Sequence, residues 1–481
     1  MIAGYYRDLI LEALGHAPTD DQRAAAEALA SFDLSPSTHA AFILRGYAGT
    51  GKTSLVSAFV RTLRQLQRPC VLLAPTGRAA KVFSQFADLP AYTIHKRIYR
   101  QRTADFDAEF SLGFNGARQV LFLVDEASMI SDTADSGSER ESLLDDLLRF
   151  VYGGDRACRL VLVGDSAQLP PVGAAESPAL QPSVLERRGL SVQMAELKQV
   201  VRQEGESGIL CNATRLRQLI ERGRCDALPR IRFAAFADVR IVPGDELIET
   251  LAACYSRDGM DDTRVVCRSN KRAVAYNNGI RSQILGHEDL LSAGEEVMIA
   301  KNNYFLWQGS EQVEEADFLA NGDRAVVERV KNVRELYGFR FADCTLALPD
   351  YGEQSVVDCI VLLDTLFAEA PALSREQQLS LYEQVLEDYA DLPTKRERLK
   401  ALRQDRYYNA VQLKYAYAVT CHKAQGGQWG NIFIDQGYLP PEQVDISYLR
   451  WLYTALTRAT RRVFFVNWRE EQTETPMRNE E

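Results

Sequence analysis

Short apolar runs recur along the chain and are separated by longer amphipathic segments. Five of these runs are almost continuously apolar, as expected of strands that are buried on both faces of a parallel sheet. They lie at 41–44, 70–75, 119–126, 159–165 and 264–269. The segments between them, such as SLVSAFVRTLRQL, favour helix. Strands that alternate with helices predict an α/β fold with mostly parallel sheets.

The pattern changes between about residues 295 and 411. Four strand-like runs, EEVMIAKNNYF, RAVVERVKN, FRFADCTLALP and SVVDCIVLLD, are joined by polar turns, and Asn321-Gly322-Asp323 is a good hairpin turn. Short strands with turn signals predict a small β-barrel. A charged stretch at 372–406 has an apolar spacing that predicts a helical arm packed on one side.

The composition is that of an ordinary soluble globular protein. The 481 residues allow roughly two to four domains, and 46% of them are hydrophobic and 25% charged. No run approaches the ~20 apolar residues of a membrane span, and the N-terminus lacks a cleavable apolar core. The nine cysteines are scattered and form no C-x-x-C pair, which predicts reduced thiols in a cytosolic protein without a structural zinc site.

The net charge of −10 argues mildly against nucleic acid as a partner, because phosphate binding needs cations. The charges are unevenly distributed: acids gather in 366–392 and in the tail 469–481, whereas residues 61–102 contain a single acid, Asp88. The basic residues of that last stretch are Arg61, Arg64, Arg68, Arg78, Lys81, Lys96, Arg97, Arg100 and Arg102. Such a stretch is compatible with a solvated helix face and equally with one basic channel in an acidic protein.

A glycine-rich turn follows the first apolar run. The sequence AFILRGYAGTGKT fits G-x-x-x-x-G-K-[ST] with Gly46, Gly51, Lys52 and Thr53. The glycines let several backbone N–H groups face one anion at a helix N-terminus. The lysine reaches the β- and γ-phosphates, and the threonine hydroxyl ligates Mg²⁺. With a strand before it and a helix after it, the turn predicts binding of a nucleoside triphosphate.

Two further strand ends carry polar side chains. Asp125 and Glu126 end the run QVLFLVDE, at the edge of a parallel sheet where active sites form. Asp125 is expected on the metal side, and Glu126 is expected to polarise the attacking water. Gln168 follows RLVLVGD and is a candidate γ-phosphate sensor, although a lone glutamine is more often an ordinary loop residue.

Short motifs follow one another along nearly the whole chain: TDDQ (19–22), the P-loop, APTGRAAK (74–81), TIHK (93–96), LVDEAS (123–128), VGDSAQLPPVG (163–173), QVVRQ (199–203), VTCHKAQG (419–426) and YTALTRA (453–459). Their order resembles that of the superfamily 1 helicases, and within them the RecD/Dda-like 5′→3′ group. The resemblance implies ATP and Mg²⁺ as cofactors.

The resemblance also implies site residues. Lys52, Asp125, Glu126 and Gln168 would be catalytic, together with two arginine fingers, Arg202 and Arg458. ATP contacts would come from Gln22, Gly46, Ala48, Gly49, Thr50, Gly51, Lys52, Thr53, Gln425 and Gly426, and Mg²⁺ ligands from Thr53 and Asp125. DNA contacts would come from Pro75, Thr76, Arg78, His95, Lys96, Thr420, His422 and Lys423. One departure concerns Gln428, where many relatives carry an acid; the ribose contact attributed to that position does not transfer.

The implied architecture has two RecA-like domains with two insertions. Domain 1A would comprise 1–98 and 119–190, and domain 2A would comprise 191–294 and 412–470. An SH3-like 2B domain with its helical arm would occupy 295–411, and a disordered tail would follow at 471–481.

The remaining insertion, 99–118, corresponds to the 1B pin of the family. It alternates aromatic and polar residues, with Phe106, Phe110 and Phe114 as candidates for the tip, and Asn115-Gly116 is a hairpin signal. An exposed aromatic ring could stack on a base. Phenylalanines that anchor a loop to the core are an equally good interpretation.

The resemblance predicts a monomeric, cytoplasmic DNA helicase of a bacterium or phage-infected cell, acting in replication, repair or recombination. It would move 5′→3′ on single-stranded DNA and act at junctions with duplex, with single-strand-binding or recombination proteins as further partners and no membrane contact. An RNA-directed helicase and a motor subunit of an exonuclease complex remain alternatives. A generic P-loop kinase does not explain the ordered motifs.

Overall fold

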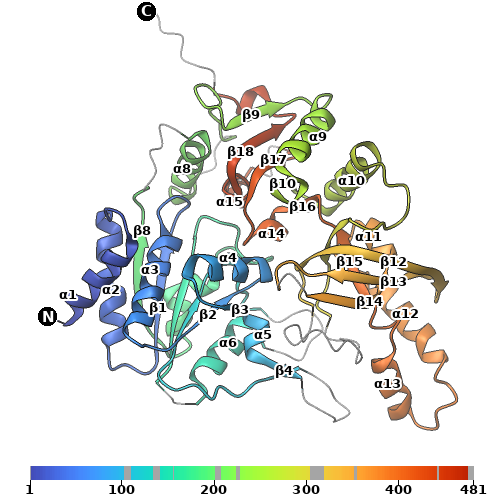
Figure 1. Ribbon diagram of the computed structural model, residues 1–481, viewed down its shortest axis with the longest axis horizontal. Coiled ribbons are helices and arrows are strands. Elements are labelled where there is room, and N and C mark those ends of the chain that lie inside the picture. The colour runs from blue at the N-terminus through green and yellow to red at the C-terminus, as the bar shows by residue number, and fades with distance from the viewer. Residues whose placement is uncertain are drawn as a thin grey trace, which may run out of the picture.

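The computed structural model describes residues 2–101, 110–133, 141–154, 157–200, 207–223, 228–303, 319–351, 355–440 and 444–474. Two parallel sheets and a closed barrel make up this part of the chain (Figure 1). The fold class is therefore as expected: an α/β protein with two RecA-like sheets and a small SH3-like barrel inserted in the second. No helix among the described residues is long and apolar enough to cross a membrane.

The first sheet has six parallel strands in the order β3-β2-β6-β7-β1-β8. Its strands are β1 (Ala40–Gly46), β2 (Cys70–Ala74), β3 (Ala91–Thr93), β6 (Leu121–Val124), β7 (Arg159–Gly164) and β8 (Ser191–Leu197). Its helices are α1 (Ile2–Leu14), α2 (Asp20–Leu34), α3 (Lys52–Gln65), α4 (Gly77–Ala87), α5 (Ile94–Ile98), α6 (Leu143–Tyr152) and α7 (Pro182–Glu186).

Both faces of this sheet are buried, which explains the continuous apolar runs. Along β1, Ile43 packs with α5 and α6, whereas Phe42 and Leu44 pack with α1, α2 and α3. Successive side chains of a strand point to opposite faces, so helices on both sides require every position to be apolar.

The second sheet has five parallel strands in the order β16-β10-β17-β18-β9. Its strands are β9 (Val239–Val242), β10 (Thr263–Cys267), β16 (Ala418–Thr420), β17 (Trp429–Asp435) and β18 (Ala459–Val466). Its helices are α8 (Gly208–Glu221), α9 (Leu247–Asp258), α10 (Asn270–Ile280), α14 (Cys421–Ala424) and α15 (Ile446–Leu456).

The barrel lies beside the second sheet and closes in the order β11-β12-β13-β14-β15 (Figure 1). Its strands are β11 (Glu296–Ile299), β12 (Arg324–Leu336), β13 (Phe339–Ala347), β14 (Val356–Leu362) and β15 (Val411–Tyr415). Between β14 and β15 the chain forms α11 (Asp364–Phe367), α12 (Arg375–Glu387) and α13 (Lys395–Gln404). The expected helical arm is thus two helices, since Leu392-Pro393 separates α12 from α13.

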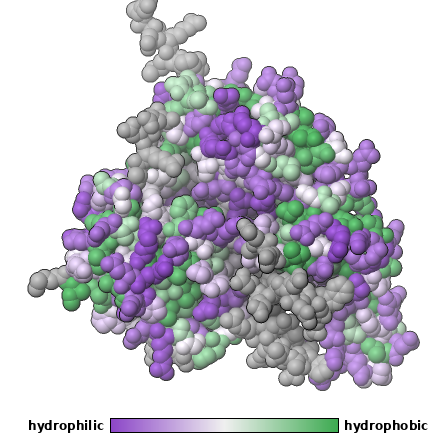
Figure 2. All heavy atoms as spheres, in the orientation of Figure 1, coloured by the Kyte–Doolittle hydropathy of each residue, from purple (hydrophilic) through white to green (hydrophobic). Residues whose placement is uncertain are grey.

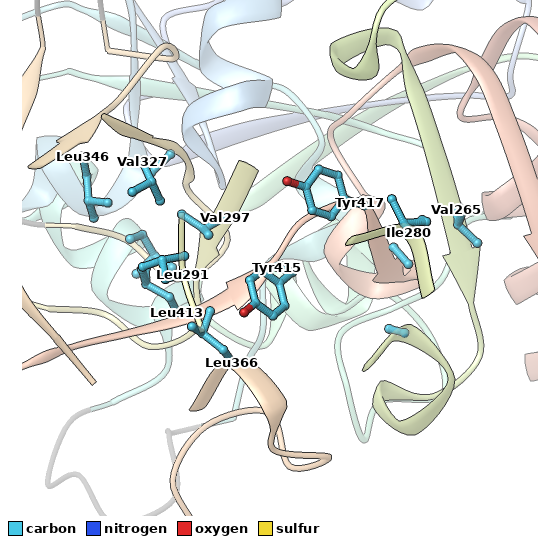
Figure 3. Close-up of a cluster of buried hydrophobic side chains, with 14 of the residues drawn as sticks. Val265, Ile280, Leu291, Val297, Val327, Leu346, Leu366, Leu413, Tyr415 and Tyr417 are labelled. Atoms are coloured by element: carbon cyan, nitrogen blue, oxygen red, sulfur yellow. The ribbon is translucent and has the colours of Figure 1, made fainter. Parts of the chain in front are cut away.

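The barrel and the second sheet share one apolar core. Val297 and Leu413 of the barrel pack in the same cluster as Val265 of β10 and Ile280 of α10, with Tyr415 and Tyr417 between them (Figure 3). The cluster is continuous, so the barrel is joined to the second sheet through buried side chains rather than through a flexible linker.

Three expected boundaries need correction. The expected start of domain 2A at residue 191 is wrong, because β8 pairs with β1 over Ala40–Gly46 and completes the first sheet. The barrel continues past 411 to Tyr415, because β15 pairs with β11 and β14. The expected disordered tail does not begin at 471: Gln472 is buried and its side chain bonds to Gln436 and Tyr448.

The inserted hairpin is formed differently from the expectation. Strands β4 (Tyr99–Gln101) and β5 (Phe110–Leu112) pair antiparallel, with Gln101 opposite Phe110, so Asn115-Gly116 lies beyond the end of β5 and does not connect the two strands. Asn115 is buried and accepts a hydrogen bond from the Ala117 N–H. Phe114 is 77% exposed but follows β5 at the open end of the hairpin, so it is not the tip. Phe106 and the Phe110 side chain lie outside the described residues.

Three arginines of the basic stretch have partners within the first domain. Arg61 donates to the Ala13 carbonyl, Arg64 pairs with Asp88, and Arg68 pairs with Asp33. The first two join α3 to its neighbours, and the third joins the loop after α3 to α2, while Arg78 and Lys81 donate to the Gln428 and Pro349 carbonyls. In the space-filling view, hydrophilic residues predominate along the band between the two sheets (Figure 2).

Candidate functional site

The glycine-rich turn joins the end of β1 to the start of α3. Gly49 and Gly51 have φ of 78° and 76°, the left-handed region in which glycine is strain-free. A Cβ at Gly46 would lie 2.4 Å from Cγ of Lys52, so only glycine fits there. Thr50 is buried and donates its N–H to the Tyr47 carbonyl at 3.3 Å. The loop therefore curls tightly at a helix N-terminus, as a phosphate cradle requires.

Lys52 is the first residue of α3, and its ammonium bridges the loop. Its Nζ donates to the carbonyl of Gly46 at 2.5 Å and to that of Tyr47 at 3.2 Å. The same atom lies 4.0 Å from Oδ2 of Asp165, which follows β7. Thr53, the expected Mg²⁺ ligand, is half-buried in the first turn of the helix. The expected lysine thus lies among the carboxyl ends of β1 and β7.

Asp125 and Glu126 follow β6 directly. The Asp125 N–H donates to the Leu73 carbonyl at 3.0 Å, which continues the pairing of β6 with β2, and the Glu126 N–H donates to Oδ1 of Asp125 at 2.9 Å. Burial and the neighbouring Glu126 charge raise the pKa of Asp125 to about 7, against the opposing effect of Lys52. Two crowded carboxylates in a poorly solvated position favour a divalent cation.

The described residues contain no cluster of three His, Cys, Asp or Glu that could hold a metal by itself. Mg²⁺ often binds through only one or two carboxylates, with water and substrate phosphates as the remaining ligands. Asp125 and the Thr53 hydroxyl fit that kind of site.

The loop after β7 holds Gln168. Its side chain is 4% exposed, and its Oε1 has no hydrogen-bond donor among the described residues. Its backbone N–H donates to Asp165 O at 3.3 Å, which turns the loop back on the strand end. A buried amide oxygen without a donor is costly, so this side chain is suited to a ligand or ordered water.

Arg458 reaches the site from the second sheet. Arg458 lies directly before β18. Its guanidinium donates to the carbonyls of Thr454 and Gly427 at 3.2 and 3.3 Å. Its Nη1 lies 3.8 Å from Oε1 of Glu126 on the first sheet. The side chain is 3% exposed. The structure therefore brings the expected finger Arg458 to the expected carboxylates.

Several other cross-sheet bonds converge on the loop 165–169. The Leu169 N–H donates to Thr454 Oγ1 at 2.8 Å, and Gln425 Nε2 donates to the Leu169 carbonyl at 2.7 Å. Arg450 donates to the carbonyl of Ser166. Gln425 thus contacts the loop after β7, and the side chains of α15 attach that loop to the second domain.

Gln22 lies behind the P-loop and not in an open base pocket. Its side chain is fully buried: Oε1 accepts from the Thr19 N–H and Nε2 donates to the Thr50 carbonyl, both at 3.1 Å. The Thr19 hydroxyl in turn accepts from the Gln22 N–H, which completes a capping box at the start of α2. In this structure Gln22 supports the loop; its contact with a base stays a prediction.

The expected DNA-side residues fall into two groups. Near α14, Arg78 donates to the Gln428 carbonyl at 2.6 Å and stacks 4.1 Å from the Trp429 ring. A Cβ at Gly426, which has φ 73°, would lie 3.0 Å from the Thr76 hydroxyl. The two segments that carry these residues are therefore in direct contact across the two sheets.

Of the remaining expected residues, two lie in α5, whereas Thr420, His422 and Lys423 lie at α14, beside the first group. His95 and Lys96 are in α5, and Lys96 Nζ lies 5.9 Å from the Tyr351 ring of the barrel. Thr420 precedes α14, where His422 is exposed. Burial lowers the pKa of Lys423 to about 8, and its Nζ has no partner among the described residues. Pro75 is half-buried just before the α4 cap Thr76, and Arg202 lies outside the described residues.

Sequence reasoning missed Asp165, Tyr453, Arg450 and Trp429. Tyr453 OH donates to Asp165 Oδ2 at 2.7 Å and accepts the Ala48 N–H at 2.9 Å. The signal that could have found the first two is their position inside VGDSAQLPPVG and YTALTRA, where they were passed over in favour of Gln168 and Arg458.

Family models match two parts of the chain. Residues 17–228 match a family described as an AAA domain, and residues 415–466 match the UvrD-like helicase C-terminal domain. Together the two ranges span more than half of the chain, and they contain the P-loop, the carboxylates after β6, and Arg458.

Two curated relatives match the chain over short regions. The ATP-dependent RecD2 DNA helicase of Deinococcus radiodurans is 33% identical over 136 residues, which are 28% of this chain and 17% of that protein. An uncharacterized protein of Methanocaldococcus jannaschii is 30% identical over 144 residues, covering 27% of this chain and 11% of that protein. The matches thus span a small part of each relative's length.

Solved structures of Pif1 helicases are similar to the chain. A structure that describes DNA unwinding at forked DNA by two coordinating Pif1 helicases has a TM-score of 0.46 and 16% sequence identity. The match covers 96% of this chain and 95% of that one. The Pif1 helicase from Candida albicans gives 0.45 at 16% identity, over 96% and 97%. By the AAA domain match, the UvrD-like helicase C-terminal match and the ordered motifs, the chain is similar to the RecD-like helicases of superfamily 1B.

Proposed function

We propose that the chain is an ATP-driven helicase that moves 5′→3′ along single-stranded DNA and separates duplex ahead of it. The observation that carries the proposal is the position of Arg458. It comes from the second sheet, yet it lies 3.8 Å from Glu126 of the first. A nucleotide site made of both sheets lets hydrolysis change the spacing between them.

The chemistry assigns a task to each side chain. The P-loop amides and Lys52 would hold the phosphates, and Thr53 and Asp125 would hold Mg²⁺, which would supply positive charge next to the phosphate oxygens. Glu126 orients the attacking water, and the open amide of Gln168 contacts the γ-phosphate. Arg458 stabilises the charge that develops on the phosphoryl oxygens in a cleft with little water. Arg202 is retained as a second finger on the resemblance alone.

DNA is assigned to the surface where the two sheets meet. Thr76, Arg78, Thr420, His422 and Lys423 would contact its backbone there, with Pro75, His95 and Lys96 further along the first domain. Backbone contacts of this kind make affinity fall with salt and give little sequence preference. The RecD2 protein of Deinococcus radiodurans carries the name of a DNA helicase, which supports DNA as the substrate.

The domain roles and the direction of movement rest on the resemblance. With the corrected boundaries, the first domain extends through β8, and the barrel extends from β11 through β15. We assign the barrel to guiding the strand and the β4–β5 hairpin to separating the duplex.

The decisive experiment is ATP-dependent strand displacement on two duplexes, one with a 5′ and one with a 3′ single-stranded tail. Unwinding only from the 5′ tail is expected. Unwinding only from the 3′ tail would contradict the direction and the roles given to the hairpin and barrel. ATPase stimulated by single strands without unwinding would indicate a motor that needs a partner. Equal stimulation by RNA and DNA of one length would contradict DNA selectivity.

Lys52→Ala is the matched control for these assays. The variant should stay folded and lose ATP hydrolysis and strand displacement together, because the phosphates lose their main cation. Near-normal hydrolysis would contradict the assignment of the site.

A further inference from the structure

Tyr453 connects the second domain to the P-loop itself. It lies in α15 and is 1% exposed, and its hydroxyl accepts one hydrogen bond and donates another. It accepts the Ala48 N–H at 2.9 Å and donates its proton to Asp165 Oδ2 at 2.7 Å. Both partners belong to the first sheet, at the ends of β1 and β7.

Ala48 lies inside the phosphate cradle, between Gly46 and Gly51. Backbone N–H groups of such a loop donate hydrogen bonds to phosphate oxygens. One N–H directed at a tyrosine oxygen at 2.9 Å is not directed at a second acceptor at the same time. The Tyr453 hydroxyl and a phosphate oxygen therefore compete for this amide.

The rest of the loop is held from the same side. A Cβ at Gly49 would lie 2.9 Å from Cδ2 of Leu210 in α8, so the second domain packs directly on the loop backbone. Tyr47, Ala167 and Leu169 of the first domain are part of the apolar cluster formed by α8, α15 and the second sheet. The conformation of the P-loop is thus coupled to how closely the second domain packs on it.

We propose that Tyr453 is a positioning residue through which the second domain holds the P-loop, and that nucleotide binding displaces its hydroxyl from the Ala48 amide. The inference rests on the proposed nucleotide site and adds a residue and a direction of coupling to it. Engagement of Tyr453 lowers nucleotide affinity, and by linkage bound nucleotide weakens the Tyr453 contact.

The test is Tyr453→Phe, with ADP plus Mg²⁺ as the probe and its Kd measured by calorimetry. Loss of the hydroxyl removes the competitor, so ADP should bind about two- to tenfold more tightly, the factor that corresponds to one net hydrogen bond. Tyr448→Phe is the control. Tyr448 is also buried in α15 and also donates one bond and accepts one, to Gln436 and from Gln472, but both partners are in the second domain. Its loss should leave the Kd unchanged.

An unchanged or weaker Kd for Tyr453→Phe would overturn the inference, as would equal tightening in both variants. Hydrogen exchange in the wild-type protein needs no variant: without nucleotide the Ala48 amide should exchange slowly, and exchange at the rate of an open loop would overturn the contact. If the wild-type protein binds neither ADP nor ATP, the proposed function fails as well. If it binds them and only the variant result differs from expectation, the inference alone fails.

Discussion

The environment of Asp125 differs from what its position in the sequence suggests. A carboxylate at a strand end is ordinarily ionised at neutral pH, but this one is half-buried and adjoins Glu126. The resulting pKa of about 7 makes its charge state depend on pH within the physiological range, and Mg²⁺ would shift the balance toward the ionised form.

Asp125→Asn should therefore stabilise the protein while abolishing ATP hydrolysis. The folded-state pKa lies above the unfolded value, so the folded chain binds more protons and its stability falls as pH rises toward 7. The gain in the free energy of unfolding should be about 1 kcal/mol larger at pH 8 than at pH 6. Melting curves at both pH values measure this gain, because each kcal/mol of stability raises the melting temperature by about 2–4 °C.

Asp245→Asn, at an exposed carboxylate, is the control and should change the melting temperature equally at both pH values. A variant at 125 that is less stable at pH 8 than the wild type would contradict the desolvation argument.

Arg458→Ala should keep ATP binding and lose hydrolysis. Its guanidinium is held by two backbone carbonyls close to Glu126, where it can oppose charge that appears only in the transition state. The barrier should rise by about 2–4 kcal/mol, seen as a fall in kcat of roughly 10²–10³ with little change in KM. Arg461→Ala is the control, because Arg461 is paired with Asp258 and Asp262 at the surface. Equal turnover in the two variants would remove Arg458 from the catalytic set.

At the scale of elements, the weakest seam of the barrel is its closure. Strands β14 and β15 are paired in parallel over only Val361↔Val411 and Leu362↔Gln412. Thr365 of α11 reinforces this seam: its hydroxyl accepts the Leu413 N–H at 3.1 Å, and its single proton has the Leu362 and Leu413 carbonyls as acceptors at 2.8 and 3.0 Å. The side chain is fully buried.

Thr365→Val should open this seam, because it leaves the Leu413 N–H buried without an acceptor. The cost should be about 1–3 kcal/mol, and amide exchange should speed up in β15 before it does so in the first sheet. Thr250→Val is the control, since that hydroxyl bonds only to the Glu246 carbonyl of the preceding turn. Uniform loss of protection across the chain would argue against a local role.

At the scale of the whole molecule, the loop 165–169 is the main polar link between the two sheets. Thr454, Gln425, Arg450 and Tyr453 all bond to it, and each comes from the second domain. Because these residues also border the nucleotide site, the stability of the domain contact and the state of that site are coupled.

Thr454→Val should loosen this contact. The Leu169 N–H would lose its acceptor at a cost of about 1–3 kcal/mol, so calorimetry should show two unfolding transitions further apart than in the wild type. Thr457→Val is the control, because its hydroxyl donates to the Tyr453 and Thr454 carbonyls of its own helix. A single unchanged transition in Thr454→Val would contradict the assigned link.

The sequence by itself determined the parts of the site that depend on local order. The glycine turn needs left-handed backbone at Gly49 and Gly51, and a strand-ending carboxylate needs only an apolar run before it, so both can be read from neighbouring residues. The two parallel sheets could also be predicted from neighbouring residues, because a strand that is buried on both faces appears in the sequence as a continuous apolar run. The motif order located Arg458 through the resemblance to the helicase family.

Only the tertiary structure decided which distant side chains share a contact. The bond between Tyr453 and Ala48 joins residues 405 positions apart, and β8 joins the first sheet by pairing with a strand 151 positions earlier at its first pair. The tertiary structure also decided the role of Gln22, whose side-chain amide bonds to the Thr19 N–H of the capping box and to the Thr50 carbonyl of the P-loop. It likewise decided the position of the hairpin, whose strands pair with Gln101 opposite Phe110 and are not joined at the Asn-Gly signal. Local patterns fix which residue types can form an element. Pairing across the chain is fixed by packing and by the need to satisfy every buried polar group, and neither leaves a local signature.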